Sequence, residues 1–206
     1  MVFAAGTTPL GLFAELRSRV ASGAIDLTGV RPVQLDEYVG LERGDPRSLW
    51  DWLSRELLVP CRVDISAAIR FELDADADEA CAAVERQLDA AGGIDLAVLG
   101  IGPNGHVGFN EPPSLPDSVT RLVRLDEASI VANARYWGSV ADVPPEAVTL
   151  GLDRLIGARE TVLLVSGAHK REILARVLEE SPSPEVPASF LREGRLTVIA
   201  DRAALP

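Results

Sequence analysis

The sequence predicts an α/β fold, with a doubly wound and mostly parallel sheet of the Rossmann-like type. Apolar runs of strand length alternate with amphipathic segments of helix length along the chain. The run 94–101 (IDLAVLGI) is continuously apolar, which is typical of a strand buried on both faces. With 206 residues, 47% apolar and 25% charged, the chain is long enough for one sizeable core. We therefore expect one domain over residues 1–206.

The elements follow in order. A short strand is expected at 2–5, and Thr8 as N-cap with Pro9 as first residue predicts a helix to about residue 21. Asp45 and Pro46 repeat this pattern of an N-cap residue followed by proline, before the helix expected at 47–58. Gly92 and Gly93 predict the end of another helix. The other expected elements are strands at 30–35, 94–101, 160–167 and 196–200, and helices at 47–58, 78–91, 127–137 and 169–180.

Charge and composition exclude several classes of protein. The net charge of −11 argues against a nucleic-acid partner, which needs a basic face, but allows a small anionic ligand in a local positive pocket. No apolar run approaches the roughly 20 residues of a membrane span. The first ten residues lack the pattern of a signal peptide, so we expect a cytoplasmic protein. Cys61 and Cys81 form no metal-like cluster and are expected to be free thiols.

Four loops follow predicted strands, at the edge where α/β sheets bind ligands. They are Gly6-Thr7-Thr8, Asp36-Glu37-Tyr38, residues 99–112 and residues 166–170. Each has a plainer interpretation. Gly-Thr-Thr can be only the start of a capped helix, and Asp-Glu-Tyr can be a solvated turn.

The segment 99–112 (LGIGPNGHVGFNEP) is the most informative. His106 lies among four glycines, which suggests a turn whose backbone approaches a ligand closely. Glu111 is either an ion-pair partner for His106 or a plain charge at a helix start. Lys170 is the single lysine beside nineteen arginines, and a compact ammonium suits a phosphate or a sugar hydroxyl.

These motifs resemble those of the glucosamine-6-phosphate deaminase (isomerase) family. LGIGPNGHVGFNEP, LDEYVGL, GTTP, VANARYW and VTLGLDRLIGARETVLLVSGAHKREIL fit that family in the same order, over nearly the whole chain. The related 6-phosphogluconolactonases share the fold and a Gly-His turn, but typically not the FNEP ending. The family pattern also has a preceding strand and helix, so the resemblance implies a sheet without that first strand and helix.

The resemblance implies a reaction in which glucosamine 6-phosphate and water give fructose 6-phosphate and ammonia, with no metal or organic cofactor. Asp36 would move a proton between C2 and C1, and His106 would open the sugar ring. Glu111 and Asn104 would orient and tune His106. The implied phosphate ligands are Gly6, Thr7, Thr8, Arg135 and Lys170. The partner is a small sugar phosphate, and a homo-oligomer is compatible with the family.

The chain departs from the family pattern at several positions. Some members carry aspartate where this chain has Asn104, which can hold an imidazole by its amide oxygen but adds no charge. Ser114 and Arg121 match the allosteric site of the hexameric enzymes, but Val123 replaces a lysine, so we expect no activation by the acetylated sugar.

Three alternatives stay open: a galactosamine-6-phosphate isomerase, which the C-terminal VPASFLREG resembles, a 6-phosphogluconolactonase, and a sugar-phosphate sensor. A sensor has no use for Asp36, His106 and Glu111 together, and no DNA-binding module is attached, so an enzyme is favoured over a sensor.

Overall fold

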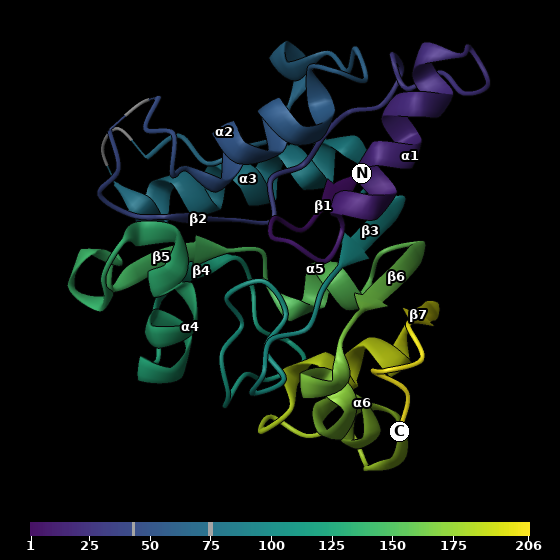
Figure 1. Cartoon of the computed structure of the whole chain (residues 1–206). Coiled ribbons are helices and arrows are strands. Elements are labelled where there is room, and N and C mark those ends of the chain that lie inside the picture. The colour runs from purple at the N-terminus through teal and green to yellow at the C-terminus, as the bar shows by residue number, and fades with distance from the viewer. Residues whose placement is uncertain (43, 74–75) are drawn as a thin grey trace.

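A four-stranded parallel sheet lies at the centre of the protein (Figure 1). The computed structural model describes residues 1–42, 44–73 and 76–206. The strand order is β1-β3-β6-β7, with β1 at Val2–Phe3, β3 at Leu96–Leu99, β6 at Glu160–Val165 and β7 at Leu196–Ala200. Val33 extends the sheet through isolated parallel bridges to Val2 and Ile69. The predicted α/β fold with a parallel sheet is confirmed.

Helices cover both faces of this sheet, because successive strand residues point to opposite sides. Phe3 and Val98 pack in one apolar cluster with Phe13 and Trp50. These belong to α1 (Leu10–Ala21) and α2 (Leu49–Leu53), and α2 continues as the π-helical η1 (Ser54–Leu58). Val2 and Ala97 pack in the other cluster. That second cluster is completed by α3 (Ala77–Ala91), α5 (Leu152–Ile156) and α6 (Arg171–Glu179).

A second sheet, which the sequence did not predict, is antiparallel and has the order β2-β5-β4. Its strands are β2 (Asp36–Tyr38), β5 (Glu146–Thr149) and β4 (Arg121–Arg124). Helix α4 (Glu127–Trp137) contributes Trp137 to a small core with Tyr38 and Ala147. In Figure 1, β4, β5 and α4 lie together at one side of the parallel sheet.

The predicted strand at 30–35 is wrong in extent. Val33 donates its N–H to the Met1 carbonyl and Gln34 to the Ile69 carbonyl, on the parallel sheet. The Leu35 carbonyl then accepts from Leu150, on the antiparallel side. This segment therefore carries the chain from one sheet to the other, and regular pairing begins only at Asp36.

Two predicted helix starts are also wrong. Pro9, not Thr8, is at the N-cap position of α1, and it has no side-chain capping hydrogen bond. Ser48, not Asp45, caps α2 by accepting from the Asp51 N–H at 3.2 Å. Asp45 instead accepts from the Arg47 N–H at 2.9 Å, because it forms its own short turn.

The other predicted elements are confirmed with small shifts of boundary. Helix α3 ends at Gly92, whose φ of 78° is the left-handed conformation that glycine favours at this position. Helix α6 is preceded by the 3₁₀ turn η4 (Ala168–Lys170), so the α-helical part begins two residues later than predicted. The remaining 3₁₀ segments are η2 (Ile65–Ala67), η3 (Val140–Asp142) and η5 (Pro187–Glu193).

Two further sequence expectations concern the cysteines and a membrane span. Cys61 and Cys81 are both buried and unpaired, as predicted for free thiols. Over residues 1–42, 44–73 and 76–206, none of the helices is long and apolar enough to cross a membrane.

Candidate active site

A cleft of about 590 Å³ opens at the carboxyl-end edge of the parallel sheet. Its walls come from the loops after β1, β3 and β6, and from β2 and α4. Most of the predicted site residues meet there. Those that line the cleft are Gly6, Thr7, Thr8, Asp36, His106, Arg135 and Lys170. Asn104 and Glu111 lie behind it, in contact with His106.

Asp36 is a buried carboxylic acid on β2. It pairs with Thr149 in the antiparallel register, and its side chain lines the cleft. Burial, with the neighbouring Glu37 charge as a smaller cause, raises the pKa of Asp36 to about 8. A carboxyl group with a pKa near neutrality can both take and return a proton.

Glu37 is just as buried, but its side chain is used by the fold. Its carboxylate accepts from the Leu49 N–H at 3.0 Å and the Trp50 N–H at 3.1 Å, at the start of α2. It also accepts from the Ser48 hydroxyl at 2.6 Å and from Gln34 Nε2 at 3.0 Å. Glu37 therefore anchors α2 to β2 and is not free to act in the cleft.

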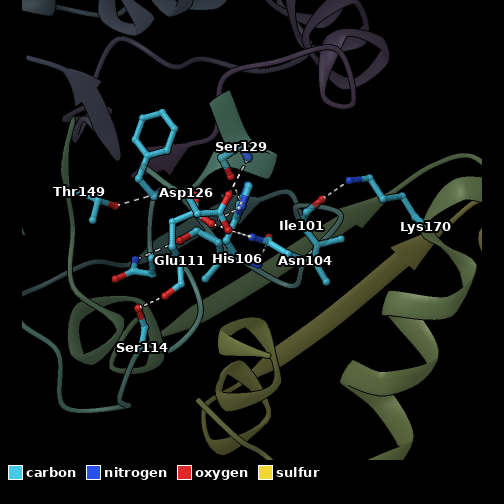
Figure 2. A network of polar contacts seen from close by, with 12 residues as sticks. Ile101, Asn104, His106, Glu111, Ser114, Asp126, Ser129, Thr149 and Lys170 are labelled. Atoms are coloured by element: carbon cyan, nitrogen blue, oxygen red, sulfur yellow. Dashed lines mark hydrogen bonds and ion pairs between the residues drawn. The ribbon is translucent and has the colours of Figure 1, made fainter. Parts of the chain in front are cut away.

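His106 is held from behind by a carboxylate (Figure 2). Its Nδ1 lies 3.2 Å from Glu111 Oε2 and 3.3 Å from the Ser129 hydroxyl. A proton on Nδ1 is favoured by this carboxylate, which leaves Nε2 for a ligand. Gly102 makes room for the ring, since a Cβ there would lie 2.3 Å from Cε1 and Nε2. This glycine thus clears space for the histidine rather than for a ligand.

Asn104 acts on His106 differently from the sequence expectation. Its amide oxygen accepts from the His106 backbone N–H at 3.2 Å, not from the ring. Its Nδ2 donates to Glu111 Oε2 at 2.8 Å and to Asp126 Oδ2 at 3.0 Å. Because only the NH₂ side of the amide can face two carboxylates, this orientation is fixed by the network.

Glu111 is ionised in this setting. Burial pushes the pKa of Glu111 upward, but the hydrogen bond and charge of His106, with contacts from Ser129 and Asn104, outweigh it and leave the pKa below its usual value. Glu111 Oε1 is buried and has no hydrogen-bond partner in the part of the chain that the structure describes. The polar contacts of this carboxylate therefore converge on Oε2.

Sequence reasoning missed Asp126 and Ser129, which join this network from the first turn of α4. Asp126 is the N-cap of α4 and accepts from the Ser129 N–H at 2.7 Å. The only signal in the sequence is an acidic residue before a helix, which any capped helix shares. It could have predicted the cap but not the contact with Asn104.

Two cations, Arg135 and Lys170, also line the cleft. Lys170 Nζ donates to the Ile101 carbonyl at 2.7 Å, which holds the ammonium at the cleft. Burial, with the nearby Arg135 charge as a second cause, lowers the pKa of Lys170. Two cations that repel each other in a partly buried site would gain from an anion between them. Gly6, with φ of 115°, turns the chain there before the uncapped start of α1.

Arg47 was also not predicted as a residue of the cleft. It lines the wall with Trp137, and its guanidinium lies 4.6 Å from the Trp137 ring centroid. Asp45 holds the same guanidinium at 2.6 Å.

Ser114 and Arg121, the two positions that match the family's allosteric site, are bonded to each other. Arg121 donates to the Ser114 hydroxyl at 3.1 Å and to the Asn110 amide oxygen at 2.9 Å. Val123 pairs with Ala147 on β5.

The comparison with protein families decides the class of this chain. The model of the family described as glucosamine-6-phosphate isomerases/6-phosphogluconolactonase matches residues 1–200. The chain belongs to this family. A curated member from Streptomyces coelicolor, named glucosamine-6-phosphate deaminase, is 40% identical over 204 residues, which cover 98% of this chain and 78% of the relative.

Solved structures of the family agree with this assignment. The structure of a monomeric glucosamine-6-phosphate deaminase has a TM-score of 0.94 at 34% identity, and the match covers 98% of this chain and 86% of that one. A 6-phosphogluconolactonase from Thermotoga maritima has a TM-score of 0.73 at 21% identity, over 97% of this chain and 84% of that one. At that identity the second match shows only a shared fold.

Proposed function

We propose that this protein is an amino-sugar phosphate deaminase, which converts glucosamine 6-phosphate and water to fructose 6-phosphate and ammonia. One observation carries the proposal: a buried acid, Asp36, faces the same cleft as the paired His106 and the cationic Arg135 and Lys170. The relatives from Streptomyces coelicolor and of known structure, which are named as deaminases of this substrate, support it.

Asp36 is assigned the proton transfer at carbon. With the sugar open, its carboxylate removes the C2 proton while the C1 oxygen takes up a proton from water, which gives an enolamine. The acid then returns its proton to C1, and the nitrogen loses one to water. The product is an imine at C2, and water hydrolyses it to the ketone and ammonia. Such an acid must exchange a proton at working pH, which its pKa of about 8 allows.

His106 is assigned the opening of the ring. Nε2 is the nitrogen available to move a proton between the ring oxygen and the anomeric oxygen, because Nδ1 faces Glu111. The ionised Glu111 stabilises the imidazolium that forms while the proton is held.

The phosphate is assigned to the part of the cleft that Arg135 and Lys170 line. Arg135 and Lys170 supply charge, while the Gly6–Thr8 loop and the first turn of α1 supply N–H donors. This cleft holds a small sugar phosphate, and neither a membrane nor a nucleic acid has a role in the proposal. We propose a cytoplasmic enzyme, and a homo-oligomer is compatible with its family.

The test is an ammonia-release assay with glucosamine 6-phosphate and galactosamine 6-phosphate, beside hydrolysis of 6-phosphogluconolactone. We expect ammonia from glucosamine 6-phosphate and its loss in Asp36→Asn. Faster release from galactosamine 6-phosphate would make that sugar, which differs in configuration at C4, the preferred substrate. Lactone hydrolysis that survives Asp36→Asn would favour the lactonase, which needs no base at C2. Binding of the sugar phosphate without any turnover would favour a sensor.

A further inference from the structure

We propose that Asp126 is a positioning residue, which fixes Glu111 against His106 through the amide of Asn104. The inference rests on the proposed function for its kinetic consequence, but the network itself exists without substrate. Asp126 lies at the N-terminus of α4, fifteen residues after Glu111 in sequence and outside the motif that carries the histidine.

The two carboxylates share one donor group. The Asn104 NH₂ has two hydrogens, and it sends one to Glu111 Oε2 at 2.8 Å and the other to Asp126 Oδ2 at 3.0 Å. Because the amide is planar, its two acceptors are held at a fixed angle to each other. Asp126 itself is fixed, since its Oδ1 accepts from the Ser129 N–H at 2.7 Å. In Figure 2, Asn104, Asp126 and Glu111 lie close together in one polar network around His106.

Apart from this amide, the Glu111 side chain contacts His106 and Ser129. Its Oε1 has no hydrogen-bond partner within residues 1–42, 44–73 and 76–206, so the Asn104 amide is a main support of the oxygen that meets His106. The Ser129 hydroxyl approaches the same His106 Nδ1 at 3.3 Å. The first turn of α4 therefore touches the histidine network at two points, while the last turn of the same helix brings Arg135 to the cleft.

Asp126 also adds negative charge behind His106, which favours the imidazolium. Removing the charge of Asp126 would leave the other charged or titratable groups near the His106 ring unchanged. They are Glu111 behind it and Asp36, Arg47, Arg135, His169 and Lys170 on the walls of the cleft.

The experiment uses Asp126→Asn in the full chain. Asparagine caps a helix about as well as aspartate, so α4 should keep its start. The new amide, however, presents an NH₂ group or a weaker, uncharged acceptor to Asn104. We expect kcat for glucosamine 6-phosphate to fall about 10-fold, by analogy with the groups that orient metal-bound imidazoles, with KM changed little.

The decisive readout is the titration of His106 by NMR. The chain has two histidines, so His169→Gln identifies the His106 signal by elimination. In Asp126→Asn the midpoint of this signal should move to lower pH. Asp76→Asn, the same change at the N-cap of α3, is the matched control and should move neither the midpoint nor kcat.

A double variant tests the route through Asn104. If Asp126 acts by this amide, Asp126→Asn should lower kcat less in an Asn104→Ala background than in the wild type, and only the effect of the lost charge should remain. Asp126→Ser, which keeps a capping oxygen but is too short to reach Asn104, replaces Asp126→Asn if that variant does not fold. An unchanged His106 midpoint, or fully additive losses, would overturn the proposal. A wild-type protein without deaminase activity would refute the function instead, and the titration would still test the network.

Discussion

Asp36 and Glu37 are adjacent acids whose side chains lie in different surroundings. Consecutive residues of a strand point to opposite sides, so only one of the two can face the cleft. Glu37 accepts from Ser48, Leu49 and Trp50 and anchors α2, whereas Asp36 lines the cleft as a buried acid. Glu37 cannot replace Asp36 as a base, because its carboxylate is occupied by these donors.

The first prediction concerns the pH dependence of the reaction. Only ionised Asp36 can take the C2 proton, so kcat/KM should rise as pH passes through about 8, the pKa of this group in the free protein. Asp36→Asn should slow exchange of the C2 proton with deuterated water by roughly 10²–10⁴-fold. Exchange at the wild-type rate in this variant would show that the base is another residue.

The second prediction concerns Gly102. In Gly102→Ala the new Cβ would meet the His106 ring at 2.3 Å, so the ring must turn and lose its contact with Glu111. We expect a large loss of kcat with a folded protein, measured by ammonia release and circular dichroism. Gly29→Ala is the control, since a Cβ there meets no atom within 4 Å. Equal activity of the two variants would mean that the ring orientation is unimportant.

The sequence could place the cleft residues because strand ends of a parallel sheet meet at one edge. His106 and Lys170 come after strands of this sheet. Asp36 follows Val33 and Gln34, which bond to the parallel sheet, although Asp36 itself lies on the antiparallel β2. Asp126 and Ser129 could not be found in this way. Their contacts depend on how α4 packs against the 99–112 segment. In the sequence, an N-cap residue looks the same whether or not its side chain also contacts another segment.

At the scale of elements, the antiparallel sheet is what sequence reasoning missed. β2 has three residues and β4 has four, which is too short for alternation of apolar and polar residues to be recognised. Their pairing is also long-range, because Asp36 pairs with Thr149. The helix α1 shows the opposite case. Its extent was predicted correctly, but the cap expected from Thr8 is absent. The N–H groups of its first turn therefore lack a side-chain cap, which suits the binding of an anion.

The third prediction concerns the two elements that carry the cations, α4 and η4. Lys170→Ala and Arg135→Ala should each weaken binding of glucosamine 6-phosphate by about 1.5–3 kcal/mol, the cost of a charge-assisted hydrogen bond. Calorimetry measures this loss directly. Arg159→Ala, which removes an exposed arginine paired with Asp95, should leave binding unchanged. If glucosamine and its 6-phosphate are turned over equally well, the phosphate site is assigned wrongly.

On the scale of the whole molecule, the cleft lies where the chain passes between its two sheets. Residues 33–35 bond to the parallel sheet and then to the antiparallel one, and Asp36 follows directly. Asp36 is thus buried at the junction of two packed layers, and this burial is the main cause of its raised pKa. The same burial must affect the stability of the whole protein, because a shifted pKa links folding to pH.

The fourth prediction is the sign of this linkage. The pKa of Asp36 is about 8 in the folded protein against an ordinary 3.8, so between these values the unfolded chain releases a proton that the folded chain keeps. The contribution of Asp36 to the free energy of unfolding therefore falls as pH rises from about 4 to about 8. Asparagine resembles the protonated acid and escapes this loss. Asp36→Asn should match the wild type in Tm near pH 4 and exceed it increasingly toward pH 8. The exposed Asp142→Asn is the control, with no such trend expected. A Tm difference that stays constant from pH 4 to 8 would contradict the burial of a protonated Asp36.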